Sequence, residues 1–240
     1  MIRRMVPWLS GLERFPPVTT ALREPNGLLA AGEDLSPGRV LDAYARGIFP
    51  WFSEGDPVLW WSPDPRMVLW LGELHVSRSL CRTIRSGRCT VTADTAFREV
   101  MEGCAAPRGG EEDTWITAGM VEAYAQLAAL GHAHSVEVWG DGALAGGLYG
   151  VALGRMFYGE SMFSRQPDAS KVALVVLVRQ LSRWGFELMD CQMSTPHLRS
   201  LGAREIPRAE FLRHVDRLVR QPAPPSPWVF DPDLLTPWSG

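Results

Sequence analysis

Three polar side chains carry the strongest chemical signal in this 240-residue sequence: Glu160, Asp190 and Gln192. Glu160 lies among apolar neighbours such as Tyr158 and Met162, and a carboxylate in such surroundings needs a partner or a chemical task. Asp190 ends an apolar run, and Gln192 follows two residues later. The three residues form either a structural polar cluster or a site that orients an attacking amine and stabilises an oxyanion.

A strand, a helix and a second strand are expected to position these side chains. The spacing predicts strands over 155–163, carrying Glu160, and over 188–191, carrying Asp190, with a helix over 168–183 between them. If the two strands are parallel neighbours, a substrate would bind where they separate.

Apolar residues of the same segments predict either ordinary core or a pocket. Leu148, Met162 and Met189 would face the apolar side of the 168–183 helix. Methionines suit adaptable pocket walls, so a branched or aromatic side chain is a candidate ligand.

An arginine row marks a second candidate surface. Arg78, Arg82 and Arg85 share one face of a helix predicted over 77–86, and no acidic residue lies between Arg78 and Arg88. The row is either a solvated face or a contact surface for a phosphate backbone.

Aromatic residues held in loops by prolines are a third feature. Phe49, Trp51, Phe52 and Trp60 flank turn signals, and the Pro-rich piece 63–65 is the candidate domain junction. These residues either pack between two domains or form a platform on which a base stacks.

The remaining pattern predicts alternating helices and strands. Asp141-Gly142 is a strong hairpin signal between strands over 134–139 and 143–153. Trp115 precedes a helix cap and is either a packing residue or part of a ligand wall. An exposed loop over 107–113 and a Pro-rich tail over 221–240, extended along the surface, are also expected. The expected helix N-caps are Ser36, Ser77, Asp94, Thr117, Asp168 and Thr195.

Composition argues against several classes of protein. No apolar run approaches the ~18 residues of a membrane span, and residues 1–8 do not resemble a signal peptide. The four cysteines lack CxxC spacing and the histidines lack a metal-ligand pattern. We therefore expect a cytoplasmic protein without a metal. A Cys191 nucleophile is also disfavoured, because its neighbour Asp190 is acidic.

Eight segments together resemble a known family, the leucyl/phenylalanyl-tRNA–protein transferases. They run in chain order: 47–52 (GIFPWF), 60–66 (WWSPDPR), 114–117 (TWIT), 131–137 (GHAHSVE), 146–150 (GGLYG), 159–164 (GESMFS), 169–171 (ASK) and 190–192 (DCQ).

The resemblance implies an α+β fold and a transferase activity. It implies a small N-terminal domain over 1–64 and a C-terminal domain over 65–240 with a mixed sheet like that of CoA-dependent (GNAT) acetyltransferases. The enzyme would move Leu, Phe or Met from aminoacyl-tRNA to the N-terminal Arg or Lys of a protein and tag that protein for degradation, without a cofactor.

The resemblance also implies residue roles. Trp51 and Trp115 would hold the terminal adenosine, and the arginine row would meet the acceptor stem. At position 195 the chain has Thr where Asn is familiar in the family, so a hydrogen bond near the ester would be supplied differently. Glu160, Asp190 and Gln192 would lie at the reacting ester and amine. The amino-acid pocket would include Leu148, Gly159, Met162, Leu174, Leu177 and Met189.

Two other functions stay open on the residues alone. A CoA-dependent acetyltransferase needs a pyrophosphate loop before a helix, whereas the nearest match, 199–204 (RSLGAR), has the wrong last residue and precedes a predicted strand. A non-enzymatic RNA-binding module would explain the arginines and tryptophans but not a buried acid cluster.

Overall fold

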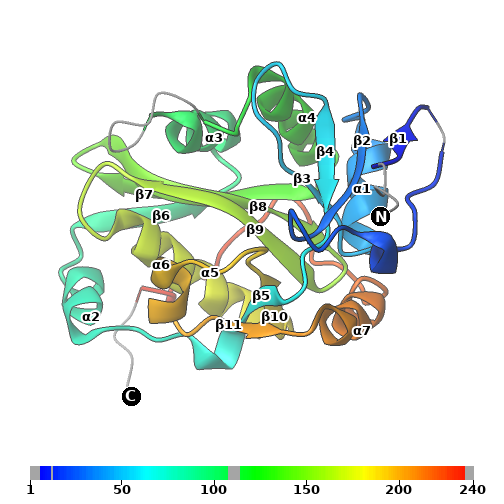
Figure 1. The fold of residues 1–240 in the computed structure, drawn as a ribbon. Coiled ribbons are helices and arrows are strands. Elements are labelled where there is room, and N and C mark those ends of the chain that lie inside the picture. Colours follow the sequence, from blue (N-terminus) through cyan, green and yellow to red (C-terminus); the bar gives the residue numbers. More distant parts are fainter. Residues whose placement is uncertain (1–5, 12, 108–113, 236–240) are drawn as a thin grey trace.

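The chain folds around two β-sheets, as the computed structural model of residues 6–11, 13–107 and 114–235 shows (Figure 1). Expectations for residues 1–5, 108–113 and 236–240 lie outside these ranges. The small sheet contains, in spatial order, β1 (Trp8–Leu9), β2 (Leu28–Gly32), β4 (Val58–Trp61) and β3 (Phe49–Pro50).

The larger sheet is mixed and has seven strands. Its spatial order is β11 (Arg204–Ile206), β5 (Arg66–Trp70), β10 (Leu188–Asp190), β9 (Met156–Ser164), β8 (Ala143–Leu153), β7 (Ala133–Gly140) and β6 (Cys89–Ala93). A small N-terminal sheet beside a larger mixed sheet confirms the predicted α+β class. The boundary between residues 64 and 65 stays a prediction.

Helices cover both faces of the larger sheet (Figure 1). α3 and α4 contribute to the core on one face together with α1, and α5 builds the core on the other face. Among the described residues, no helix is long and apolar enough to cross a membrane. The helices are α1 (Pro37–Ala45), α2 (Arg78–Arg85), α3 (Phe97–Ala105), α4 (Ala118–Ala129), α5 (Ala169–Arg183), α6 (Pro196–Ser200) and α7 (Arg208–Leu218), with 3-10 turns at Val18–Thr20 and Leu71–Glu73.

The β7–β8 hairpin confirms the turn predicted at Asp141-Gly142. Both residues have positive φ, 52° and 76°, which is the conformation of a turn that matches strand twist. Asp tolerates this region and Gly adopts it without steric cost.

Three of the predicted helix caps are confirmed with their side-chain hydrogen bonds, Ser36 and Asp168 hold the predicted position without one, and Asp94 is wrong. Ser77, Thr117 and Thr195 each accept a hydrogen bond from the backbone N–H three residues on. Asp94 and Asp168 both adopt left-handed backbone, with φ of 54° and 65°. Asp168 is still the N-cap residue of α5, without a side-chain cap bond, whereas the N-cap of α3 is Ala96 and not Asp94. The carboxylates of both residues bond to other groups, so neither accepts a hydrogen bond from the first turn of the helix. Ser36 precedes α1 at the predicted place without a side-chain cap bond.

The carboxylate of Asp94 anchors the C-terminal segment. It accepts hydrogen bonds from His134 Nδ1 at 2.8 Å and from the Trp228 N–H at 2.7 Å. The Trp228 ring stacks on His134 with centroids 3.7 Å apart. Trp228 and Leu234 are buried, so the Pro-rich segment packs into the core of the α5 face rather than merely extending over the surface.

The parallel pair β9–β10 confirms the arrangement expected around Glu160 and Asp190. α5 connects the two strands, which pair only at Met189 with Phe157 and at Asp190 with Tyr158. Beyond these pairs the two strands separate. Glu160 and Gln192 both follow the last pair, on opposite sides of the separation.

Candidate active site

A β-bulge in β9 sets the direction of the Glu160 side chain. Tyr149 of β8 pairs with Ser161 and Gly150 pairs with Gly159, so Glu160 is the extra residue. A bulge of this kind re-aims a side chain and is common beside active sites. It also reverses the alternation, which places Met162 on the α5 face, the same face as Phe157.

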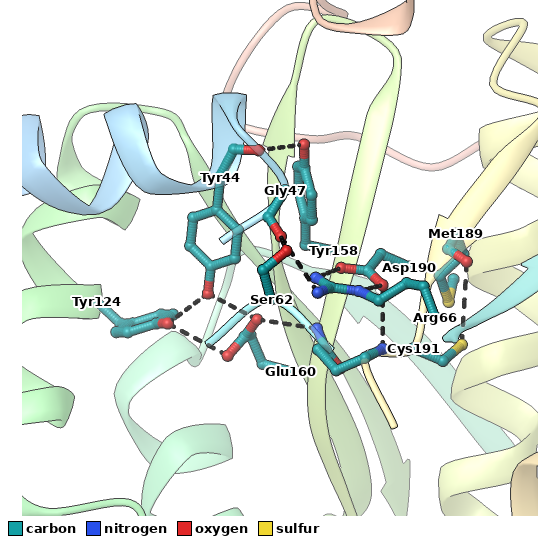
Figure 2. Close-up of polar contacts among 11 residues, drawn as sticks. Tyr44, Gly47, Ser62, Arg66, Tyr124, Tyr158, Glu160, Met189, Asp190 and Cys191 are labelled. Atoms are coloured by element: carbon teal, nitrogen blue, oxygen red, sulfur yellow. Dashed lines mark hydrogen bonds and ion pairs between the residues drawn. The ribbon is translucent and has the colours of Figure 1, made fainter. Parts of the chain in front are cut away.

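Two tyrosines from different helices hold the Glu160 carboxylate (Figure 2). Tyr44 of α1 donates to Oε1 at 2.7 Å, and Tyr124 of α4 donates to Oε2 at 3.2 Å. The two hydroxyls are 2.5 Å apart. Burial raises the pKa of both phenols well above the usual value, so both stay protonated and act as donors at neutral pH.

The Glu160 carboxyl titrates near neutrality. Burial raises its pKa to about 7, and the negative charge of Asp190 adds to this effect, whereas the hydrogen bonds from Tyr44 and Tyr124 oppose it. Burial disfavours the charged form because the carboxylate loses water. A bound cation such as an ammonium group would stabilise the charged form of a carboxyl group with this pKa.

Asp190 forms a fully buried ion pair with Arg66 of β5 (Figure 2). Arg66 Nε donates to Oδ1 at 2.8 Å and Nη2 donates to Oδ2 at 2.6 Å. The guanidinium lies between the rings of Phe49 and Phe211, at 4.7 and 4.6 Å from their centroids. It also donates to the carbonyl of Gly47 at 3.2 Å. Both oxygens of Asp190 therefore already have a protein partner.

Gln192 is held in a strained turn directly after β10. Its φ is 55°, which is costly for a residue with a Cβ. Its N–H donates to Asp190 Oδ1 at 3.0 Å and its carbonyl accepts from Met67 at 3.1 Å. These bonds hold the backbone while the side-chain Nε2 approaches Glu160 Oε1 at 3.4 Å.

An apolar pocket lies between β9, β10 and α5, with Glu160 and Gln192 in its wall. Its cavity volume is about 120 Å³, comparable to the ~150 Å³ cavity that holds a benzene molecule in another protein. All six residues expected to form the amino-acid pocket line it, namely Leu148, Gly159, Met162, Leu174, Leu177 and Met189.

The other predicted site residues lie outside the lining of this pocket. Trp51 and Trp115 are half-buried and pack against the core of the α1, α3 and α4 face. The exposed Thr195 caps α6. The three arginines of the row, Arg78, Arg82 and Arg85, are exposed on α2.

The sequence interpretation missed the partners of the acids. No local pattern links Tyr44 or Tyr124 to Glu160, and Arg66 stands out only as part of the segment 60–66. The available signal was chemical: a buried tyrosine hydroxyl needs a hydrogen-bond partner. The spacing of residues in the sequence did not reveal that Glu160 is the partner of these hydroxyls.

Cys191 is not a nucleophile in this arrangement. The thiol is buried, and burial together with the charge of Asp190 raises its pKa far above the usual value. A thiolate is therefore disfavoured at neutral pH. Within the described ranges, no group of three or more His, Cys, Asp or Glu residues is arranged to bind a metal ion.

An apolar pocket, a carboxylate suited to an ammonium group and an amide beside it define a site that can bind an aminoacyl group. Comparison of the sequence with known families points to proteins that act on aminoacyl groups. Residues 33–64 match the model of the leucyl/phenylalanyl-tRNA protein transferase N-terminal domain, and residues 68–216 match that of leucyl/phenylalanyl-tRNA protein transferase.

Similar proteins carry the same family name. The chain is 62% identical over 217 residues to a leucyl/phenylalanyl-tRNA–protein transferase of Thiobacillus denitrificans, covering 90% of this chain and 95% of that one. It is 60% identical over 227 residues to one of Nitrosospira multiformis, covering 95% and 98%. The chain therefore belongs to the leucyl/phenylalanyl-tRNA–protein transferase family.

Similarity to solved structures is weaker. A GCN5-related N-acetyltransferase from Kribbella flavida shares 13% identity with a TM-score of 0.38, over 70% of this chain and 60% of that one. This likeness carries no argument about function.

Proposed function

We propose that this protein transfers Leu or Phe, and also Met, from aminoacyl-tRNA to the amino terminus of a protein. The observation that carries the proposal is the Glu160 carboxylate in the wall of an apolar pocket. The pocket would bury the amino-acid side chain while Glu160 binds the α-ammonium group of the same residue. Family membership supplies the tRNA donor and the protein acceptor.

The reaction needs positioning more than activation. The acceptor amine attacks the ester carbonyl, a C–N bond forms, and the C–O bond to the terminal ribose breaks. The proton lost by the amine ends on the released ribose hydroxyl. Because the ester is already activated, the enzyme mainly aligns the amine and stabilises the oxyanion.

Gln192 orients the acceptor amine, because its amide lies beside Glu160 and carries both donor and acceptor atoms. Asp190 was expected to lie at the reacting ester and amine. Its bidentate pair with Arg66 instead supports a positioning role. The ion pair would hold the strained turn that presents Gln192.

The remaining assignments rest on the family resemblance. Trp51 and Trp115 would hold the terminal adenosine, the arginine row would meet the acceptor stem, and Thr195 would supply a hydrogen bond near the ester. The acceptor would carry an N-terminal Arg or Lys, and its modification would mark it for degradation in the cytoplasm. Residues 1–64 and 65–240 would be separate domains.

A transfer assay tests the function. The enzyme is incubated with radiolabelled Leu-tRNA and a protein that begins with Arg, with and without acetyl-CoA. We expect label on the protein without acetyl-CoA. Acetylation that requires acetyl-CoA would instead support an acetyltransferase, and RNA binding without transfer would support a binding module.

Gln192→Ala separates catalysis from donor binding. We expect the transfer rate to fall by about 100-fold or more, as for general loss of a positioned polar group, while affinity for charged tRNA is retained. An unchanged rate measured under single-turnover conditions would remove Gln192 from the reaction.

A further inference from the structure

A second hollow lies next to the amino-acid pocket, at the end of β9. Its cavity volume is about 380 Å³, and it is lined by residues of β9, α3, α5 and α6. Met162 lines both the hollow and the pocket. The pocket and the hollow therefore share the Met162 side chain as part of their walls.

The hollow combines an apolar floor with a rim that carries the guanidinium of Arg165. Met162 and Phe163 form part of the floor, and Arg165 and His197 lie on the rim with Ser170. No carboxylate is among its described lining residues. The rim suits an anion, and the cation of an acceptor with N-terminal Arg or Lys would be repelled there.

Arg165 is the permanent cation of this rim. Its guanidinium carbon lies 5.3 Å from the centroid of the Phe163 ring, and Nη1 donates to the Leu144 carbonyl at 3.3 Å. These contacts use part of a guanidinium that has five N–H donors, so the group is oriented yet still able to bind a phosphate. The N-terminal end of α5, where Ser170 lies, adds a favourable dipole.

The chain links the hollow to helix α2, which carries the arginine row. Segment 164–169 leads from the hollow to the start of α5, where Asp168 Oδ2 accepts a hydrogen bond from Thr83 of α2 at 3.3 Å. α2 carries Arg78, Arg82 and Arg85. The hollow thus borders the amino-acid pocket at Met162, and segment 164–169 leads from it to the contact between α5 and α2.

We propose that this hollow binds a phosphodiester of the single-stranded 3′ end of the donor RNA, with Arg165 as its main ligand. The proposal rests on the proposed aminoacyl-tRNA donor. It adds a phosphate subsite between the aminoacyl group and the acceptor stem, so that binding of the last nucleotides does not depend on base stacking alone.

Two donor analogues test the subsite. Both carry leucine in a stable 3′-amide link, one on adenosine alone and one at the end of the trinucleotide CpCpA. For Arg165→Ala we expect affinity for the trinucleotide to fall about tenfold, as for a lost charge-assisted hydrogen bond. Affinity for the adenosine compound, which has no phosphate, should not change. Equal losses for both analogues, or none for either, would overturn the proposal.

Ser170→Asp is a second variant that spares the fold. An acidic residue in the first turn of α5 favours the helix but repels a phosphate in the hollow. We expect an unchanged thermal midpoint and weaker trinucleotide binding. Unchanged trinucleotide binding would contradict the proposal. Arg213→Ala, an exposed arginine of α7, is the matched control and should bind both analogues normally.

The test separates this subsite from the function it rests on. A wild-type enzyme that neither binds the analogues nor transfers leucine from Leu-tRNA would refute the aminoacyl-tRNA function itself. A raised KM for the acceptor protein in Arg165→Ala, with unchanged donor affinity, would assign the hollow to the acceptor and refute only the phosphate subsite.

Discussion

Two opposing effects set the pKa of the Glu160 carboxyl group. Burial favours its neutral form, while the hydroxyls of Tyr44 and Tyr124 favour its charged form. The resulting pKa of about 7 means that lowering the pH through neutrality neutralises the group expected to bind the donor ammonium. The value of kcat/KM for the donor should therefore fall below pH 7.

Removing one of the two tyrosine hydroxyls should shift the acid limb of the kcat/KM profile, the range in which activity falls as the pH is lowered. Tyr44→Phe deletes the 2.7 Å donor to Oε1, so the charged form loses support and the pKa rises. A hydrogen bond of about 0.5–1.5 kcal/mol corresponds to roughly 0.4–1.1 pH units. We expect the acid limb of the kcat/KM profile to shift upward by this amount.

Tyr158→Phe is the matched control for the pH experiment. Its hydroxyl donates to the Tyr44 carbonyl at 2.7 Å rather than to Glu160. The acid limb should stay in place in this variant. A limb that moves equally in both variants, or in neither, would contradict the role given to Tyr44.

At the scale of elements, β9 forms one wall of the amino-acid pocket with little side-chain bulk at Gly159. A Cβ placed there would meet Met189 Sδ at 3.4 Å and the Asp190 carbonyl at 3.5 Å. These are ordinary contacts, so the fold accepts alanine, but the added methyl group takes space from the pocket.

Gly159→Ala should therefore change donor preference. We expect kcat/KM to fall about tenfold more for Phe-tRNA than for Leu-tRNA, because the aromatic ring needs more room. Competition between the two charged tRNAs measures the ratio. Gly119→Ala on the exposed face of α4, with only Thr117 Oγ1 near at 3.7 Å, should leave the ratio unchanged. A constant ratio in Gly159→Ala would place the amino-acid side chain elsewhere.

The arginine row of α2 makes a separate prediction about salt. If Arg78 and Arg82 each contact one phosphate, each alanine variant should flatten the slope of log affinity against log salt by about 0.7–0.9. Titrations of tRNA at several salt concentrations measure this slope. An unchanged slope would remove the row from the RNA interface, and Arg213→Ala again provides the control.

At the scale of the whole molecule, the pair Arg66–Asp190 joins the small sheet to the larger sheet. Arg66 of β5 contacts the Gly47 carbonyl and the Phe49 ring of the N-terminal part, and it binds Asp190 of the neighbouring strand β10. Removing one member leaves an uncompensated buried charge.

Asp190→Ala should accordingly destabilise the protein by about 3–5 kcal/mol. The double variant Arg66→Met, Asp190→Leu should regain most of this stability, because apolar side chains of similar volume replace the pair. Denaturant unfolding measures stability, and the transfer assay measures activity.

Activity should stay low in the double variant, since the turn of Gln192 loses its bond to the Asp190 carboxylate and keeps only the one from Met67. A double variant that is as unstable as Asp190→Ala would show that the two residues are not energetically coupled. Full activity in the double variant would show that the ion pair is not needed to position Gln192.

Local sequence signals determined the elements and most of the pocket. Apolar periodicity located the strands around Glu160 and Asp190, and Asp141-Gly142 located the hairpin, because turn and strand preferences act over a few residues. The apolar pattern pointed to Leu148, Met162 and Met189 against the apolar face of α5, and the resemblance to the family added Gly159, Leu174 and Leu177; all six line the pocket.

Tertiary structure alone decided how the acids are held. Tyr44 and Glu160 are 116 residues apart in sequence, and Arg66 and Asp190 are 124 apart, so no local period links them. The bulge at Glu160 breaks the alternation that the sequence implies. Buried charges and hydroxyls find partners wherever packing brings them together. This long-range pairing places Arg66 against Asp190 and two tyrosines against Glu160.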